Sequence, residues 1–345
     1  MTDNIKVSII VPIYNVEPYI ARCIQSVMDQ TYGGPMECFL VDDCGTDNSM
    51  AVAKQMISAY NGPVDFKVLH HEHNRGLSAA RNTGTDASIG EYVYYLDSDD
   101  AMTSDCIALM VAEIEKHPNV EMVVGAHRGI YEEASNNYLT RMTPCYVDNN
   151  EWIRFQYFKE QSGLTTVAWN KLVRLDFLNS NSLRFKEGFI HEDEHWSFYV
   201  YQKLRRLSII EDITYLHYLT SNSIMSTSTA QKRANAMFPI VSDWVNDFSE
   251  PCLALQVFKS LEHFRFHVLP HLPKKQMRPL YFKFLKWLVR IGQYKIAFLW
   301  MVNWFCDFRH SQLYYKMIPE VYQAEERKKV PLADSEKSKW VLEHS

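Results

Sequence analysis

The sequence predicts an α/β protein: a doubly wound, mostly parallel sheet with helices on both faces, followed by a helical C-terminal region. Short apolar runs alternate with helical patterns over roughly the first hundred residues, as expected when helices connect parallel strands. Several of these runs end in polar or acidic residues. After about residue 231 no further strand pattern occurs, and apolar residues recur at helical spacing.

The first expected strand is the continuous apolar run at residues 7–11, which is typical of a parallel strand covered on both faces. We expect Pro12 to end its ladder because proline has no N–H to donate. A helix should begin at Glu17–Pro18, and the Thr31–Pro35 stretch should terminate it. Further strands are expected at residues 37–41 and 66–70, with helices at 50–60 and 78–88.

The aromatic run YVYY at residues 92–95 predicts a buried central strand that ends near Asp97. Three carboxylates follow within four residues, at Asp97, Asp99 and Asp100. Their mutual repulsion would be offset by a hard divalent cation, which binds carboxylate oxygens and substrate phosphates. The alternative is an acidic turn that caps the next helix. Ligands of doubly wound sheets bind at the carboxyl ends of strands, so these acids and Asp42–Asp43 predict a site.

Length and composition set further bounds. The 345 residues allow two domains, which we place at residues 1–225 and 226–345. A net charge of −5 gives no indication of a nucleic-acid partner. The seven cysteines are scattered without a C-x-x-C pair, which favours reduced thiols in a cytoplasmic protein. The first residues do not have the pattern of a signal peptide, and no apolar run reaches the ~18–20 residues that span a bilayer.

Four segments together resemble the successive motifs of family 2 glycosyltransferases. They are VSIIVPIYN at residues 7–15, VDDCGTDNS at 41–49, NRGLSAARNTG at 74–84 and LDSDD at 96–100. That family has the GT-A fold, a nucleotide-binding α/β domain, and the resemblance covers about the first two-thirds of the chain. The absence of G-x-G-x-x-G disfavours a dinucleotide-binding dehydrogenase.

The resemblance implies a binding site for a nucleotide-sugar donor, most simply a UDP-sugar. Tyr14 would stack on the uracil ring, and Asp43 would accept its imide N–H. Arg81 would either face the pyrophosphate or be a surface helix residue. Asp99 would bind Mn²⁺ or Mg²⁺, and Asp97 would contact the ribose or share the metal. The expected donor-binding residues are Pro12, Tyr14, Asn15, Glu17, Asp43, Asn74, Gly76, Arg81, Asp97 and Ser98.

The middle of the chain supplies the expected acceptor side. Residues 189–198 resemble the E-D segment of the family, in which the Asp is the general base; this implies Asp193 as base and Glu192 as its orienting partner or an acceptor contact. His191 is a further candidate acceptor contact. Trp169, in the family's W-N-K-L segment, either stacks on the acceptor sugar or is an ordinary core residue.

Residues 215–226 resemble the family's closing segment, although Leu219 stands where the family usually has Arg. His217 either reaches the metal, diphosphate or acceptor, or is a structural histidine.

Three other functions compete with this interpretation. His191-Glu192-Asp193-Glu194-His195 formally matches the H-E-x-x-H pattern of zinc metalloproteases, which would leave the four N-terminal motifs unexplained. A nucleotide-sugar-binding protein without catalysis is disfavoured by intact Asp97, Asp99 and Asp193. A nucleotidyltransferase of related build usually has a Gly-rich basic loop after its first strand, and Ile13-Tyr14-Asn15 is not one.

The helical C-terminal region is basic between residues 271 and 316, where Asp307 is the one acid. Aromatic residues are interleaved with its lysines and arginines. Such helices suit an anionic membrane surface, which would make the protein peripheral at the inner face of the plasma membrane. The alternative is that the aromatics pack and the lysines are solvated. The resemblance implies a glycan or lipid-linked saccharide acceptor of the bacterial capsule, O-antigen or lipopolysaccharide type.

Overall fold

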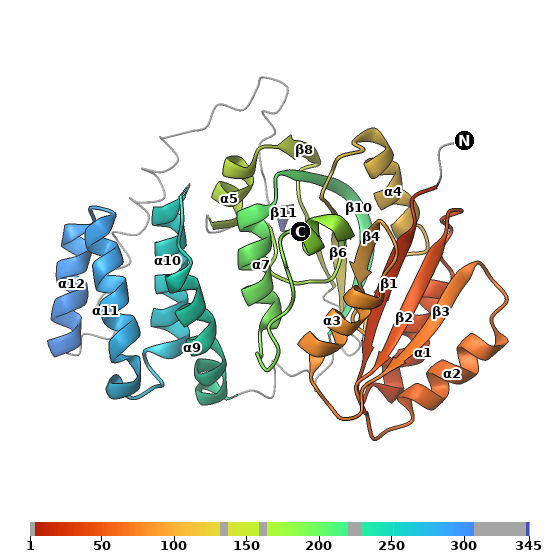
Figure 1. Cartoon of the computed structure of the whole chain (residues 1–345), viewed down its shortest axis with the longest axis horizontal. Coiled ribbons are helices and arrows are strands. Elements are labelled where there is room, and N and C mark those ends of the chain that lie inside the picture. The colour runs from red at the N-terminus through yellow and green to blue at the C-terminus, as the bar shows by residue number, and fades with distance from the viewer. Residues whose placement is uncertain are drawn as a thin grey trace. The chain divides into compact units, whose positions relative to one another are not determined.

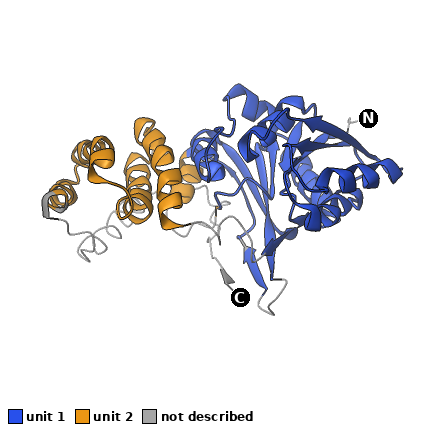
Figure 2. Ribbon diagram, turned by 90° about the horizontal axis from the view of Figure 1, so that it is seen from below, with its two compact units in different colours: residues 1–150, 165–223, 334–345 blue, residues 151–164, 224–333 orange. Residues whose placement is uncertain are grey.

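The computed structural model describes residues 4–131, 137–158, 164–219, 229–250, 252–306 and 343–344. The chain divides into two compact units (Figure 2). The first contains residues 1–150, 165–223 and 334–345, and the second contains residues 151–164 and 224–333.

The first unit is built on a sheet in which β3, β2, β1 and β4 are parallel neighbours (Figure 1). These strands are β1 (Val7–Ile13), β2 (Met36–Asp42), β3 (Val64–His70) and β4 (Tyr92–Tyr95). The helices that connect them are α1 (Glu17–Met28), α2 (Ser49–Ala59) and α3 (Leu77–Ala87). The chain therefore has the doubly wound arrangement that its alternating pattern predicts.

Beyond β4 the sheet continues through antiparallel pairings. β9 (Lys171–Arg174) lies between β4 and β6 (Met122–Tyr131) and is antiparallel to both. The long strand β10 (Arg206–Leu219) runs parallel to β6 with two register shifts. Shorter strands complete the sheet: β5 (Ala101–Met102), β7 (Tyr138–Arg141), β8 (Cys145–Asp148) and β11 (Glu343–His344). The helices of this part are α4 (Cys106–Lys116), α6 (Leu175–Ser180) and α7 (Glu192–Lys203).

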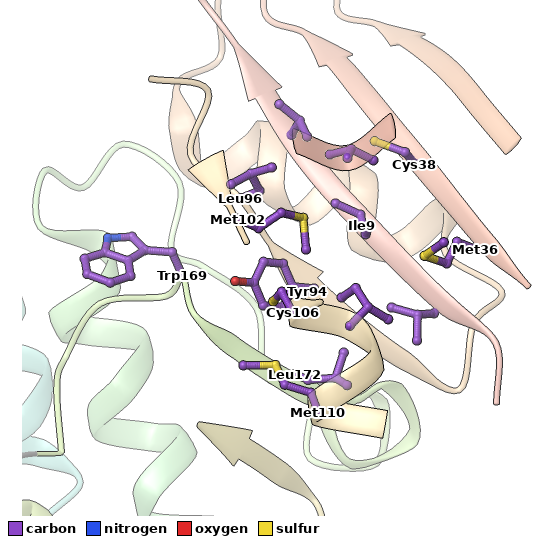
Figure 3. Close-up of a cluster of buried hydrophobic side chains, with 14 of the residues drawn as sticks. Ile9, Met36, Cys38, Tyr94, Leu96, Met102, Cys106, Met110, Trp169 and Leu172 are labelled. Atoms are coloured by element: carbon purple, nitrogen blue, oxygen red, sulfur yellow. The ribbon is translucent and has the colours of Figure 1, made fainter. Parts of the chain in front are cut away.

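Helices cover both faces of the sheet, and successive side chains of β1 point to these two faces in turn. Ile9 and the β1 residues that point to the same face belong to an apolar cluster that also contains buried residues of α1, α2 and α4 (Figure 3). On the opposite face Ile10 meets α3 so closely that a Cβ on Gly84 would lie 2.5 Å from its Cγ2 atom. Burial on both faces explains why β1 is apolar apart from Ser8, whose hydroxyl donates to Glu37.

One strand end differs from the expectation. β1 does not stop at Pro12 but continues to Ile13, with Pro12 opposite Val41 of β2. Its pairing with β4 ends earlier, at Ile10, whose carbonyl accepts from Leu96 N. Alternate residues of a strand hydrogen bond to opposite sides, and Ile13 bonds toward β2, so the Pro12 nitrogen faces the β4 side. The missing N–H therefore costs no ladder bond.

The second unit is helical throughout its described parts. It contains α5 (Asn150–Phe158) from Glu151 onward, α9 (Ala230–Asn246), α10 (Leu253–His263), the π-helical turn η1 (Phe264–Val268), α11 (Lys274–Arg290) and α12 (Tyr294–Cys306). Its core includes Trp244, Phe264, Tyr281 and Trp300, all at most 1% exposed. None of the helices within the described ranges has the length and apolarity needed to cross a membrane. The predicted fold class, including the helical C-terminal region, is confirmed.

Candidate functional site

The loops after β1 and β2 are tied to each other by the side chains expected to contact the donor. Asn15 adopts a left-handed conformation with a φ of 51°, and its Oδ1 accepts from Thr46 N at 2.7 Å. The Glu17 carboxylate accepts from Asn48 N at 3.0 Å, and Glu17 N donates to the Asp47 carboxylate at 2.8 Å. Asn15 and Glu17 therefore help to shape the two loops. Pro12 is buried at the end of β1.

Asp43 is 2% exposed and accepts three hydrogen bonds from the loop that precedes α3. Arg75 N donates to Oδ1 and Gly76 N donates to Oδ2, each at 2.8 Å. The His71 Nδ1 atom lies 2.6 Å from Oδ1, and its Nε2 lies 2.9 Å from Thr83 Oγ1. Asp43 thus fixes the loop that carries Asn74, and it joins β2 to the start of α3.

The remaining expected donor contacts around these loops differ in exposure. Tyr14 is 46% exposed, so its ring face is accessible for stacking. Asn74 is exposed on the loop before α3. Gly76 precedes α3 with a φ of 87°, a backbone conformation that residues other than glycine rarely adopt.

The acidic strand end after β4 is held through its backbone. Arg22 NH2 donates to the Asp99 carbonyl at 2.7 Å, which leaves the Asp99 carboxylate unconstrained by that contact. Asp97 and Asp99 are partly exposed, whereas Ser98 is 7% exposed. Burial and the neighbouring Asp97 carboxylate raise the pKa of Asp99 to about 6. The site therefore concentrates negative charge.

Asp100 is directed away from the other two carboxylates toward β10. It is 2% exposed, Tyr215 OH donates to its Oδ2 at 2.7 Å, and Tyr218 N donates to its Oδ1 at 2.8 Å. Burial and the adjacent Asp99 raise the pKa of Asp100 to about 8. Asp100 therefore anchors β10 to the acidic strand end, and its described hydrogen bonds do not cap a helix.

Arg81 joins the acidic strand end to the segment of the expected base. Its NH2 donates to Asp97 Oδ1 and its NH1 donates to Glu192 Oε1, both at 2.7 Å. The residue is 2% exposed, and its guanidinium lies 5.2 Å from the centre of the Phe185 ring. It is therefore not a surface helix residue, and both of its terminal nitrogens contact carboxylates of the protein.

The expected base lies in the first turn of α7. Glu192 begins the helix, and the partly exposed Asp193 follows. Burial and the adjacent Glu192 raise the pKa of Asp193 to about 7, whereas Arg81 acts in the opposite direction. A carboxylate with a pKa near neutrality suits general-base catalysis, because it is both ionised and basic at cellular pH.

The H-E-x-x-H pattern does not have the geometry of a zinc-binding helix. His191 precedes α7 as its N-cap in a left-handed conformation with a φ of 66°, while His195 lies within the helix and is 7% exposed. The two histidines therefore do not share a helix face. Across the described residues, no group of three or more His, Cys, Asp or Glu side chains could hold a metal ion.

Trp169 and His217 belong to an aromatic cluster on the central sheet. The Trp169 ring is stacked on Tyr215 with centroids 4.4 Å apart, and the residue is 8% exposed. His217 is tilted against Trp169, and its Nδ1 lies 3.0 Å from Tyr138 OH. Burial lowers the pKa of His217, and Asp97 opposes this effect. Trp169 thus packs in the core, whereas His217 lies near enough to Asp97 to feel its charge.

The sequence did not indicate roles for two residues beside the site. Arg22 on α1 contacts the Asp99 carbonyl and lies over the Tyr218 ring at 3.4 Å. Lys171 is 1% exposed and donates to Thr165 Oγ1 and to the Val167 carbonyl. Burial lowers the pKa of Lys171 to about 7, and the charge of Asp193 opposes that shift. The W-N-K motif was the available signal for Lys171, but no sequence pattern singled out Arg22.

The donor set at the acidic strand end fits a hard divalent cation. Asp97 and Asp99 provide carboxylate oxygens, which Mg²⁺ and Mn²⁺ prefer. Burial and the neighbouring Asp97 raise the pKa of Asp99, so a nearby positive charge would be favourable. Two protein carboxylates are too few to enclose an ion, which is the arrangement expected when substrate phosphates complete the coordination.

The role of Asp43 in fixing the loop before α3 can be tested by Asp43→Asn. An amide cannot accept from both Arg75 N and Gly76 N through separate oxygens, so one of these part-buried donors loses its partner. We expect a loss of about 1–3 kcal/mol in the free energy of unfolding, together with faster hydrogen exchange at the Gly76 amide. Asp65→Asn is the matched control because the Asp65 side chain is 65% exposed. Equal effects of the two substitutions would contradict the structural role of Asp43.

Comparison with known proteins identifies the family. Residues 8–178 match the family described as Glycosyl transferase family 2. Glycosyltransferase GlyG of Streptococcus pneumoniae is 28% identical over 70% of this chain and 80% of its own length. The uncharacterized glycosyltransferase EpsJ of Bacillus subtilis is 29% identical over 63% of this chain and 62% of its own length.

A solved structure of Staphylococcus aureus TarS 1–349 in complex with UDP-GlcNAc has the same fold. Its TM-score is 0.63, at 20% identity over 99% of this chain and 97% of that chain. The fold, the family match across the sheet and its acidic strand end, and the glycosyltransferase relatives together show that this chain belongs to glycosyltransferase family 2.

Proposed function

We propose that this chain is an inverting glycosyltransferase that moves a sugar from a nucleotide-sugar donor, a UDP-sugar, to a hydroxyl group of a glycan or lipid-linked acceptor. One observation carries the proposal. The Arg81 bridge links Asp97 of the acidic strand end to Glu192, the residue beside Asp193. Donor-binding carboxylates and a carboxylate suited to removing a proton thus belong to one connected cluster, as transfer to a hydroxyl group requires.

In the proposed mechanism Asp193 removes the proton of the acceptor hydroxyl as its oxygen attacks the anomeric carbon. The sugar changes its configuration in this single displacement, and the nucleoside diphosphate departs. A pKa of about 7 lets Asp193 be ionised near neutrality while remaining basic enough to accept a proton. Glu192, held by Arg81, orients the first turn of α7.

On the donor side, Tyr14 is proposed to stack on the base from its exposed position after β1. Asp43 is proposed to meet the base while its loop-fixing hydrogen bonds keep Asn74 and Gly76 beneath the donor. Pro12, Asn15, Glu17 and Ser98 shape the surrounding loops. Trp169, His191 and His217 are retained as proposed acceptor contacts, although the stacking of Trp169 on Tyr215 favours a supporting role for it.

Asp99 and Asp97 would hold Mn²⁺ or Mg²⁺, which would offset the negative charge of the departing diphosphate. A mannosyltransferase from Pyrobaculum calidifontis was solved with GDP-Man and Mn²⁺, at a TM-score of 0.53 to this chain. TarS structures with UDP and with UDP-GlcNAc favour a uridine nucleotide for this chain. A poly(ribitol-phosphate) β-glucosyltransferase of Bacillus spizizenii is also a relative, at 26% identity, which favours a polymeric acceptor.

We propose that residues 1–225 hold the catalytic machinery and that residues 226–345 bring the enzyme to an anionic membrane surface on the cytoplasmic side. The exposed residues of α11 include Lys275, Arg278, Lys286 and Arg290, and the helix has no acidic residue. Several aromatics of this region are instead packed: Tyr281 and Trp300 stack with centroids 4.2 Å apart. The proposed contact therefore uses the basic face of α11 and the exposed rings of Tyr294 and Phe298.

The general-base role is tested by Asp193→Asn. Donor binding should stay nearly unchanged, while the rate of sugar transfer falls by about 10²–10⁴-fold because the amide cannot accept the proton. In the wild type, transfer should rise as the pH passes about 7, since Asp193 must be deprotonated to act. Rates are measured with the nucleotide-sugar that turns over best in a panel of donors. Glu192→Gln should cost less than Asp193→Asn, and the reverse order would reassign the base.

The metal site is tested by Asp99→Ala. This substitution should abolish Mn²⁺-dependent turnover and weaken nucleoside diphosphate binding measured by calorimetry, because it removes a carboxylate ligand. The fold should survive, since the Arg22 contact is to the Asp99 carbonyl and not to the side chain. Full activity of the variant, or of the wild type in excess EDTA, would contradict the proposal.

Membrane association is tested by sedimentation with vesicles that contain anionic lipid. The protein should bind at low salt and be released as ionic strength rises, because salt screens surface charges. Replacing Lys283, Lys286 and Arg290 by Gln should weaken binding without changing donor hydrolysis. Replacing the exposed residues Lys54, Lys203 and Arg205 by Gln is the charge-matched control. Failure of the full-length protein to bind at low salt would leave the helices with a packing role alone.

A further inference from the structure

Arg81 is buried behind the two carboxylates that it bridges. Its side chain is 2% exposed, against 25% for Asp97 and 11% for Glu192. One terminal nitrogen donates to each carboxylate at 2.7 Å, and the guanidinium lies over the Phe185 ring. A guanidinium presents its donors in a fixed planar fork, so these contacts set the separation of the two carboxylates as well as neutralising them.

The carboxylates belong to segments that are far apart in the sequence. Asp97 follows β4, whereas Glu192 begins α7 and is 111 residues from Arg81. Asp193 itself is held only locally among the described residues, where its Oδ1 accepts from Glu194 N at 2.9 Å. The position of Asp193 relative to the donor carboxylates therefore depends on the anchor that its neighbour Glu192 makes with Arg81.

The helix that carries Arg81 is itself firmly attached to the segment before α7. Asn82 Nδ2 donates to the Phe185 carbonyl at 2.7 Å, and Phe185 N donates to Asn82 Oδ1 at 2.8 Å. The Phe185 ring in turn is stacked on Trp196 of α7, with centroids 4.8 Å apart. α3 is thus a rigid support from which Arg81 can hold the first turn of α7.

We propose that Arg81 is a positioning residue that holds Glu192 in register with Asp97, and thereby directs the Asp193 carboxylate toward the acceptor hydroxyl next to the donor. This role rests on the proposed glycosyl transfer. It differs from the direct contact with the donor pyrophosphate that the family resemblance implied for Arg81, because both terminal nitrogens of the buried guanidinium donate to the protein's own carboxylates.

The charges around Asp193 give the proposal a second signature. Glu192 and Glu194 on α7, Arg81 on α3 and Lys171 on β9 all act on this carboxylate or feel its charge. Arg81 lowers the pKa of Asp193 and Glu192 raises it. Removing Arg81 should therefore move the acidic limb of the transfer rate to higher pH, and removing the Glu192 charge should move it to lower pH.

The experiment compares Arg81→Gln, Arg81→Lys, Glu192→Gln and the Arg81→Gln/Glu192→Gln double variant. Arg81→Gln should lower kcat by about 10²-fold, the scale expected when a reacting group is displaced by about 1 Å. Arg81→Lys should also lower kcat but leave the pH limb near its wild-type position, because an ammonium keeps the charge and cannot bridge both carboxylates. The double variant should be little worse than Arg81→Gln alone, since the two residues act as a unit.

An exposed ion pair nearby provides the matched control. Arg184 Nε lies 2.8 Å from Asp86 Oδ1, with side chains 29% and 64% exposed. Arg184→Gln, Asp86→Asn and their double variant should change kcat by less than about threefold and show no coupling, as is usual for exposed pairs.

Two further measurements separate the alternatives. If Arg81 were a direct ligand of the pyrophosphate, Arg81→Gln would weaken UDP binding measured without added metal by tenfold or more, the scale of a charge-assisted hydrogen bond. The acidic limb of the transfer rate would not shift. That result would overturn the proposal. Additive losses in the Arg81 and Glu192 variants overturn it as well. Hydrogen exchange at the amides of the first turn of α7 should accelerate in Arg81→Gln, and unchanged exchange there would overturn the proposal. This measurement does not depend on activity. Absence of sugar transfer by the wild type would separately refute the proposed function.

Discussion

The organisation of the first unit depends on how carboxylates at neighbouring strand ends are kept from repelling one another. Three of these carboxylates each have their own partners. Asp43 accepts backbone amides from the loop before α3, Asp97 accepts from Arg81, and Asp100 accepts from Tyr215 and from Tyr218 N. Burying an unpaired carboxylate costs free energy, so each buried carboxylate needs a partner. Each partner in turn fixes the chain segment to which it belongs. The same interactions therefore compensate the charges of the carboxylates and hold the loops in place.

These partners leave one carboxylate of the acidic strand end without a described side-chain partner. The backbone of Asp99 is held by Arg22, while burial and Asp97 raise the pKa of its carboxyl group to about 6. Such a group gains from a nearby positive charge. The same logic distinguishes Glu192 from Asp193, since Glu192 is paired with Arg81 and Asp193 has a pKa of about 7. Pairing thus distinguishes Glu192 from Asp193, whereas Asp97 is both paired with Arg81 and a proposed metal ligand.

In the second unit the aromatic residues divide between packing and exposure. Tyr281, Phe284 and Trp300 form part of the core, and Trp287 Nε1 donates to the Val245 carbonyl. Tyr294 and Phe298 are 67% and 59% exposed. The mixture of basic and aromatic residues in the sequence therefore combines two populations with different roles, and only the exposed one can meet an external surface.

The sequence by itself determined the order of the first four strands and the three helices between them, the acidic strand end and the candidate base, because periodicity and short motifs are local properties of a chain. It also indicated the family, which the comparisons show. Tertiary structure decided what the motif residues contact. Pro12 costs no ladder bond because the pairing of β1 with β4 ends at Ile10. Asp100 holds β10 because its carboxylate accepts from Tyr215. The ion pair between Arg81 and Glu192 joins residues 111 positions apart, and no local pattern encodes such a pairing. It arises only when α3, β4 and α7 pack together.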